Sequence, residues 1–349
     1  MPKDNLPLPS LPVPAKRPGI VPRLLSWLFA PGSGAPRRAV FGTHEELFRI
    51  RGELAVLRAA LEAVRAEVGR RDIATLDELL RRGNRREIEA LIRDRTHTVP
   101  LPDGSVLCRV LGRFKMYVDS AEAAIAPHLL LDGYWQYWVT EFICRNVARG
   151  ERVYDVGAVY GYYTILLADL VGTEGHVVAL EGNPWLHWLL ARNIRVNGLA
   201  RHVEARRLVA VEAPQEAITI PAIVTGPADG PFAADFAQAG NRATCTAPAV
   251  ALEDIEPGSA DFIRIGGGTF PDRVVAGLGG LMDRSPGLRI LLEFDANRCA
   301  DAPALLAALA GRYPLRFVDG DARAKPTTVE DVLERQRVTT LYLSRVEPA

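Results

Sequence analysis

The stretch of sequence that decides the fold reads VYDVGAVYGYYT and spans residues 153–164. A short apolar run ends in an acid, Asp155, and is followed by a Gly-x-x-x-Gly turn from Gly157 to Gly161 and a predicted helix. Glycines let the backbone approach a ligand closely, and the first turn of a helix offers free N–H groups. The spacing differs from the GxGxxG of dinucleotide-binding folds. The acid before the turn suits a ligand with an ammonium group better than a bare pyrophosphate.

A second strand is predicted at residues 176–180, and it ends in Glu181. An acid at the carboxyl end of the second strand can accept hydrogen bonds from both ribose hydroxyls of a nucleoside. The turn at residues 182–184 leads into a predicted helix that ends at Gly198. The order strand, acid, glycine turn, helix, strand, acid therefore indicates an open α/β sheet that binds a nucleoside-bearing cofactor.

These motifs resemble those of the FkbM-type methyltransferases, within the class I S-adenosylmethionine-dependent superfamily. In that family DVGAxxGYYT is followed by an acid, an NP turn and an NxxxNG helix end, which match residues 153–164, 177–183 and 193–199. The resemblance extends over about residues 150–345, with strands expected at 261–265, 290–293 and 340–344. It implies a Rossmann-like, mostly parallel, seven-stranded sheet with an antiparallel last strand. It also implies S-adenosylmethionine as the cofactor and O-methylation of a hydroxyl on a glycan or secondary metabolite.

The resemblance also assigns cofactor contacts. The loop at the methionine side of the cofactor would be formed by Asp155, Gly157, Gly161 and Thr164. Glu181 would hold the ribose, and Asn183 would lie beside the adenosine. Two smaller departures from the family pattern are Val159, where Asn is common, and Gly182, where Pro is common.

The largest departure follows the predicted fourth strand. Family members usually carry Ile-Asp-x-Glu-Gly there, whereas this chain reads IGGGT at residues 265–269, so Gly266 and Gly268 replace two acids. An O-methyltransferase needs a group that takes the hydroxyl proton. Glu293 and Asp295, at the end of the fifth strand, are the candidate catalytic bases. The alternative is that Glu293 is structural and Asp295 is a loop acid.

The chain ahead of residue 150 divides into three expected segments. Residues 1–41 form a proline-rich tail, predicted to be disordered because 9 of the first 36 residues are proline. An alternative is weak contact of residues 20–30, which are apolar with basic neighbours, with an anionic membrane surface. The apolar run is far shorter than the ~20 residues of a membrane span. Residues 73–149 are predicted as a helical and hairpin lead-in to a methyltransferase-like domain at 150–349.

Residues 42–72 are predicted as a coiled-coil helix. Their apolar residues alternate at steps of three and four, with Glu at the g positions and Arg at the e positions of the heptads. The apolar seam consists of Leu47, Ile50, Leu54, Leu57, Leu61, Val64 and Val68. This pattern favours a homo-oligomer formed through residues 44–69, and the alternative is a helix packed on its own domain.

Composition limits the remaining possibilities. The chain has 42 basic and 42 acidic side chains, a balance that argues against a nucleic-acid partner. Its four cysteines contain no CxxC pair, which argues against zinc or a disulfide framework and for a reduced, cytoplasmic compartment. The expected partner is a small-molecule or glycan acceptor. The rival function is a catalytically inactive methyltransferase-like scaffold or ligand-sensing module that dimerises through its coiled coil. An NAD-dependent enzyme is disfavoured by the missing GxGxxG.

Overall fold

The computed structural model describes residues 50–52, 54–55, 58–59 and 84–349, apart from 240–241, 256–257, 267 and 336. The chain divides into two units, Met1–Arg70 and Arg71–Ala349. The described residues of the first unit are helical. The proline-rich tail and the rest of the expected coiled-coil segment lie outside the described residues, so the coiled-coil pairing stays a prediction. Within the described part of the chain, no helix is long and apolar enough to cross a membrane.

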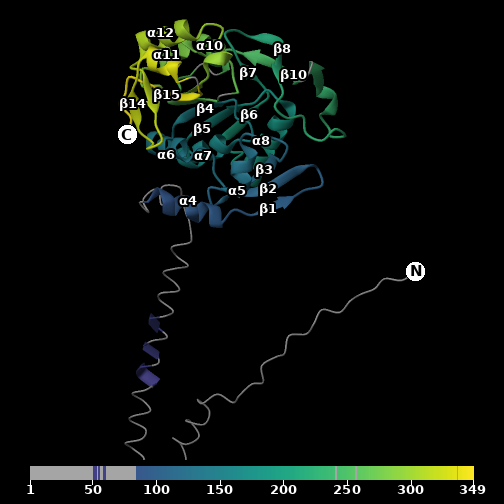
Figure 1. The fold of residues 1–349 in the computed structure, drawn as a ribbon, viewed down its shortest axis with the longest axis vertical. Coiled ribbons are helices and arrows are strands. Elements are labelled where there is room, and N and C mark those ends of the chain that lie inside the picture. Colours follow the sequence, from purple (N-terminus) through teal and green to yellow (C-terminus); the bar gives the residue numbers. More distant parts are fainter. Residues whose placement is uncertain are drawn as a thin grey trace, which may run out of the picture. The chain divides into compact units, whose positions relative to one another are not determined.

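A mixed sheet of eight strands forms the centre of the second unit (Figure 1). In order across the sheet, the strands are β14 (Ala324–Pro326), β13 (Arg316–Val318), β15 (Thr339–Leu343), β12 (Arg289–Phe294), β11 (Phe262–Ile265), β4 (Arg152–Val156), β5 (His176–Leu180) and β6 (Val203–Arg206). The five strands from β12 to β6 are parallel, and β15 runs antiparallel to β12. The predicted α/β sheet with an antiparallel last strand is confirmed.

The sheet has one strand more than the seven that were predicted. The extra strand is β14, which pairs antiparallel with β13 at the edge of the sheet. A tight turn joins the two strands, in which the N–H of Ala322 donates to the carbonyl of Asp319. Two strands of three residues each are too short to leave a periodic pattern in the sequence, which is why β14 escaped prediction.

The order of the parallel strands reverses at β4. The chain continues from β4 to β5 and β6 on one side, and it returns to place β11 and β12 on the other side. Ligands of open α/β sheets bind at the carboxyl ends of the strands, where the order reverses. The loops that follow β4, β5 and β11 therefore surround the expected binding crevice.

Helices cover both faces of the sheet (Figure 1). One face packs against α6 (Tyr137–Asn146), α7 (Tyr162–Val171) and α8 (Pro184–Val196), and the other against α10 (Pro271–Ala276), α11 (Gly279–Arg284), α12 (Ala302–Arg312) and α13 (Val329–Glu334). Side chains of a strand alternate between the faces. In β4, accordingly, Val153 belongs to the first hydrophobic cluster and Tyr154 and Val156 to the second.

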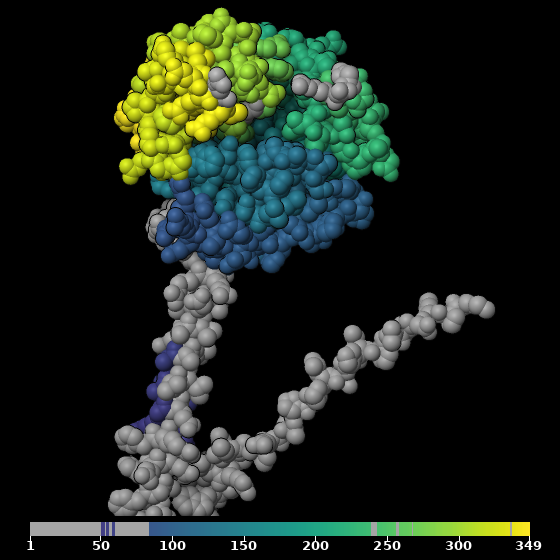
Figure 2. Space-filling view, viewed as in Figure 1, coloured from purple at the N-terminus to yellow at the C-terminus, as the bar shows by residue number. Residues whose placement is uncertain are grey.

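The lead-in forms a helix, a three-stranded antiparallel sheet and a second helix. These are α4 (Arg85–Asp94), β1 (Thr98–Pro100), β2 (Ser105–Val110), β3 (Phe114–Asp119) and α5 (Ala126–Leu131). The predicted hairpin is present as β1 and β2. Buried residues of the lead-in belong to the same hydrophobic cluster as those of α6, α7 and α8. The side-chain amide of Asn193 in α8 also forms hydrogen bonds with the backbone N–H and carbonyl of Tyr117 in β3. The lead-in and the central sheet therefore share one core, and Figure 2 shows the lead-in in direct contact with the part of the chain that follows it.

A smaller sheet is inserted between β6 and β11. It contains β7 (Val209–Ala210), β8 (Gln215–Pro221), β9 (Phe236–Ala239) and β10 (Arg242–Val250), with a 3-10 turn, η1 (Ala233–Asp235), before β9. The helix α9 (Leu252–Ile255) leads from it to β11, and a second 3-10 turn, η2 (Ala296–Arg298), follows β12. The inserted sheet stands beside the carboxyl ends of the central strands (Figure 1) and supplies one wall of the site described below.

Candidate functional site

The loop after β4 has the backbone that its glycines require. Gly157 and Gly161 have φ values of 71° and 84°, in the left-handed region that glycine adopts without strain. A Cβ on Gly161 would also collide with Leu190 of α8. Val159 has a φ of 55°, which costs a β-branched residue about 1–3 kcal/mol. Asn tolerates this conformation better, which explains why Asn is common at this position in the resembling family.

Glu181, directly after β5, holds this loop in place. It is 8% exposed, and its carboxylate accepts hydrogen bonds from the N–H of Val159 at 2.9 Å and the N–H of Asn183 at 2.8 Å. Burial raises the pKa of Glu181, and the backbone N–H donors oppose that rise. A carboxylate has about four acceptor sites, more than these backbone donors occupy, so Glu181 can still accept a hydrogen bond from a ligand hydroxyl.

A pocket lies between the loops after β4 and β5. Gly157, Glu181 and Asn183, three of the predicted cofactor residues, line it together. Asn183 is held as the N-cap of α8, and its side-chain amide donates to the carbonyl of Val224 at 2.8 Å. Most of the pocket wall is apolar and includes Val156, Val159, Leu180, Leu186, Leu208, Val209, Ala210 and Ile220, and Thr269 and Arg298 are polar residues of its lining. A carboxylate beside an apolar wall suits a nucleoside, because the wall covers the base and the carboxylate accepts from the ribose.

The other three predicted cofactor residues do not line this pocket. Asp155 is fully buried and accepts hydrogen bonds from the hydroxyl of Thr164 at 2.5 Å and from Arg264 at 3.2 Å. Burial raises the pKa of Asp155, while the Arg264 cation and the Thr164 hydroxyl oppose the rise. Gly161 begins α7, one turn from Thr164. Asp155 and Thr164 therefore lie behind the glycine turn, and Gly161 ends that turn.

Arg264 of β11 is the site residue that the sequence analysis missed. Its guanidinium donates to Asp155, to Glu293 at 2.5 Å and to the backbone carbonyl of Gly157 at 3.1 Å. It also lies over the ring of Tyr163, at 4.5 Å from the ring centroid. One signal in the sequence could have revealed it, because Arg264 is the single charged residue in the strand FIRI, and a charged side chain in a strand that is buried on both faces needs partners.

The two candidate bases lie in different places. Glu293, 8% exposed, is paired with Arg264 and lines neither the pocket nor the cleft described next. Asp295 lines the cleft, and its carboxylate accepts from the backbone N–H of Asn297 at 3.0 Å and from the Asn297 amide at 3.2 Å. Of the two predicted bases, Asp295 therefore lies where an acceptor could reach it.

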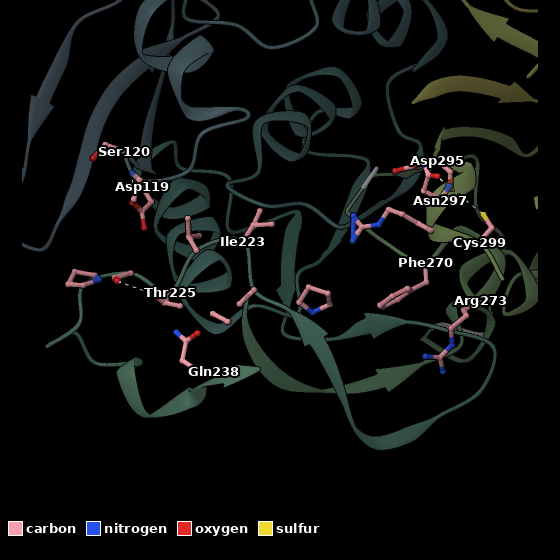
Figure 3. Close-up of a pocket in the computed structure, with 18 of the residues that line it drawn as sticks. Asp119, Ser120, Ile223, Thr225, Gln238, Phe270, Arg273, Asp295, Asn297 and Cys299 are labelled. Atoms are coloured by element: carbon pink, nitrogen blue, oxygen red, sulfur yellow. Dashed lines mark hydrogen bonds between the residues drawn. The ribbon is translucent and has the colours of Figure 1, made fainter. Parts of the chain in front are cut away.

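A cleft of about 1480 Å³ adjoins the pocket (Figure 3). Asp119 and Ser120 at the end of β3 lie at one side, and Asp295 and Asn297 lie at the other. Ile223, an apolar residue that is 62% exposed, lies between them. The cleft and the pocket share Pro221, Ile223, Phe270 and Arg298. A ligand in the pocket would therefore face a second molecule in the cleft.

Gly266 and Gly268, at the positions where the resemblance predicts acids, differ in their surroundings. A Cβ on Gly266 would lie 2.8 Å from the Arg264 guanidinium and 2.9 Å from the carbonyl oxygen of Gly157. A Cβ on Gly268 would meet no atom within 4 Å. An acid at position 266 is therefore incompatible with the observed positions of Arg264 and Gly157, whereas position 268 has room for a side chain.

Comparison with known proteins gives partial sequence matches. Residues 116–225 match the family model described as protein-L-isoaspartate(D-aspartate) O-methyltransferase. The protein-L-isoaspartate O-methyltransferase of Ignicoccus hospitalis is 33% identical over 69 residues, which are 20% of this chain and 29% of that relative. Both matches cover less than half of the chain. The residues matched by the family model carry the loops after β4 and β5 and end before those after β11 and β12.

Solved structures with a similar arrangement are remote in sequence. A TehB-like SAM-dependent methyltransferase from Corynebacterium glutamicum has a TM-score of 0.38 and 14% identity, covering 63% of this chain and 94% of that one. The methyltransferase FkbM from Methylobacillus flagellatus has a TM-score of 0.35 and 15% identity, covering 55% and 43%. At this level of similarity they carry no argument about function. The strand order of this chain is that of a Rossmann-like α/β fold, and the pocket lies at the point where that order reverses.

Proposed function

We propose that the protein is an S-adenosylmethionine-dependent methyltransferase. The observation that carries this proposal is the buried carboxylate of Glu181, which lines an apolar pocket together with Gly157 at the reversal of strand order. The match of residues 116–225 to a methyltransferase family model supports it, because those residues contain both pocket loops.

The pocket residues fit this cofactor. Glu181 would accept a hydrogen bond from the ribose, since its carboxylate has more acceptor sites than its backbone donors occupy. The apolar wall, which includes Leu208 and Ile220, would cover the adenine ring. When bound, the cofactor supplies an electrophilic methyl group on a sulfonium centre.

The cleft is the proposed acceptor site, and the proposed acceptor is a hydroxyl of a glycan or secondary metabolite. The walls of the cleft would hold the acceptor oxygen in line with the methyl group, and such positioning supplies a large part of the rate. Asp295 is the proposed base, because its carboxylate lines the cleft and is oriented by Asn297. It would accept the hydroxyl proton as the O–C bond forms and the bond between the methyl carbon and the sulfonium sulfur breaks, which leaves S-adenosylhomocysteine as the second product.

A second candidate function is a ligand-sensing module that binds the cofactor without transferring its methyl group. The geometry at Gly266 favours it, because the Arg264 guanidinium occupies the space next to the position where family members carry an acid. This candidate keeps the pocket and gives up only the chemistry in the cleft.

Calorimetric titration with S-adenosylmethionine and S-adenosylhomocysteine tests the proposal. We expect micromolar binding that is strongly weakened in Glu181→Gln. The matched control is Glu204→Gln, which alters an exposed acid of β6 paired with Arg206. Absence of binding at millimolar cofactor would refute both candidate functions.

The two candidates separate in a turnover assay. If the protein is an enzyme, S-adenosylhomocysteine accumulates with at least one acceptor in a panel of glycan and secondary-metabolite hydroxyl compounds. Asp295→Asn should then slow turnover without changing cofactor affinity. Cofactor binding without turnover over the whole panel would favour the sensing module.

A further inference from the structure

Three charged side chains lie side by side on the three central strands of the sheet. Asp155 of β4, Arg264 of β11 and Glu293 of β12 are 0%, 5% and 8% exposed. Arg264 is paired with Asp155 across β11 and β4, and Glu293 lies two residues beyond the partner of Arg264 on β12. All three therefore face α7, because residues two apart on a strand share a face. We refer to these residues as the buried charge triad.

The triad replaces apolar side chains in a hydrophobic layer. Val153, Phe262 and Leu291, two residues earlier on the same strands, belong to the core cluster of that face. Burying charges is costly, and well-packed apolar residues often give equal or greater stability than a buried ion pair. Stability alone therefore does not account for the triad, and its contacts outside the three side chains become informative.

One contact of the triad reaches the cofactor loop. The Arg264 guanidinium donates to the carbonyl of Gly157, which lines the pocket. The N–H groups of Gly157 and Ala158 donate to the carbonyl of Leu180, and Glu181 accepts from Val159. The loop is thus held by β5 on one side and by Arg264 of β11 on the other, which maintains the left-handed backbone at Val159.

Arg264 acts on the pocket without being part of its wall. It lines a separate small cavity behind the loop, together with Trp135, Tyr162 and Tyr163. Gly266 belongs to the same arrangement, because a Cβ there would meet both the guanidinium and the Gly157 carbonyl. The glycine at 266 lets β11 approach the loop closely enough for Arg264 to hold it.

We propose that Arg264 is a positioning residue that sets cofactor affinity by fixing the carbonyl of Gly157, and that Gly266 is required for this contact. The proposal rests on the proposed function, since it assumes that the pocket takes S-adenosylmethionine. It explains why an acid is absent at 266, because a side chain at that position would displace the group that orders the loop.

The test compares two alanine substitutions in the full chain. Gly266→Ala places a methyl group against Arg264 and Gly157, whereas Gly311→Ala adds the same group in open space on α12, outside the pocket and the cleft. We expect Gly266→Ala to weaken S-adenosylhomocysteine binding by about 10- to 100-fold in calorimetry, the range that corresponds to the loss of one hydrogen bond to a charged group. Gly311→Ala should leave the affinity within about twofold, because Gly311 is exposed and lines neither the pocket nor the cleft.

A second variant separates positioning from folding. Asp155→Asn, Arg264→Met and Glu293→Gln together remove all three charges, so no unpaired charge is left in the core. We expect this triple variant to melt close to the wild type by circular dichroism and to bind S-adenosylhomocysteine weakly. A purely structural role would change the melting temperature and leave the affinity of the folded protein unaltered.

The outcomes are distinguishable. Failure of the wild type to bind S-adenosylhomocysteine overturns the proposed function itself. Wild-type binding with equal affinities for Gly266→Ala and Gly311→Ala overturns only the role of Arg264 and Gly266. Wild-type affinity in a folded triple variant overturns the same role. If the triple variant does not fold, the comparison of the two alanine variants decides.

Discussion

Replacing Arg264 by Met tests the energetic role of the buried charge triad. Asp155 and Glu293 would remain in place with no cation between them, at 0% and 8% exposure. Removing one partner of a buried ion pair costs about 3–5 kcal/mol, because the remaining charge is desolvated and unpaired. We expect Arg264→Met to lower the free energy of unfolding by about this amount at pH 8.

The deficit should depend on pH with a definite sign. Burial raises the pKa of Asp155 in the wild type, and Arg264 is the strongest influence opposing that rise. Without Arg264 the pKa in the folded state rises further above the unfolded value. Stability linked to such a group is present below the unfolded pKa and is lost as the pH rises through the folded pKa. The deficit of Arg264→Met should therefore shrink as the pH is lowered, by about 1.4 kcal/mol per pH unit for each extra proton that the folded variant binds.

Urea denaturation followed by circular dichroism at pH 8, 7 and 6 measures this deficit. The control is Arg273→Met, whose guanidinium pairs with Glu212 at the surface, where the two side chains are 32% and 44% exposed. We expect that control to cost no more than about 1 kcal/mol and to be insensitive to pH over this range. A deficit below 1 kcal/mol for Arg264→Met, or one that is constant from pH 8 to 6, would refute the reasoning.

Three further predictions concern other parts of the molecule. Trp185→Phe removes the indole donor 2.8 Å from the buried Asp119 carboxylate and should lower the free energy of unfolding, measured by urea denaturation, by about 1–3 kcal/mol. The control is Trp188→Phe, which changes the ring stacked on Trp185, and an equal loss of stability in both variants would contradict the prediction. Val159→Asn relieves the left-handed backbone of a β-branched residue and should raise Tm by about 2–4 °C for each kcal/mol regained; an unchanged or lower Tm in calorimetry would count against that strain. Removal of residues 1–72 should lower the assembly state in sedimentation, and an unchanged state would argue against the predicted coiled coil.

Local patterns were sufficient for the elements nearest the glycine turn. The strand before Asp155 and the strand before Glu181 were predicted because each is a short apolar run that ends in an acid. Gly157 and Glu181 meet in one pocket because parallel neighbouring strands end at the same edge of the sheet. The hairpin of β1 and β2 and the antiparallel β15 followed from equally local signals and from the family resemblance.

The parts that escaped prediction depend on segments far apart in the chain. Arg264 lies 109 residues from Asp155 and 29 from Glu293, so no local pattern reveals that the three charges meet. The cleft is also formed by segments that are far apart in the chain, because its lining combines the end of β3, the inserted sheet and the loops after β11 and β12. For this reason Glu293 and Asp295 looked equivalent as bases in the sequence, although only Asp295 faces the cleft.

The sequence alone determined the class of the fold and the two loops that line the pocket after β4 and β5, because strand periodicity, glycine spacing and terminal acids act within a few residues. Tertiary structure alone decided what stands behind those loops. The pairing of β11 with both β4 and β12 brings a guanidinium between two buried carboxylates and against the Gly157 carbonyl. That contact explains the glycine at 266, because a side chain there would overlap the Arg264 guanidinium and the Gly157 carbonyl.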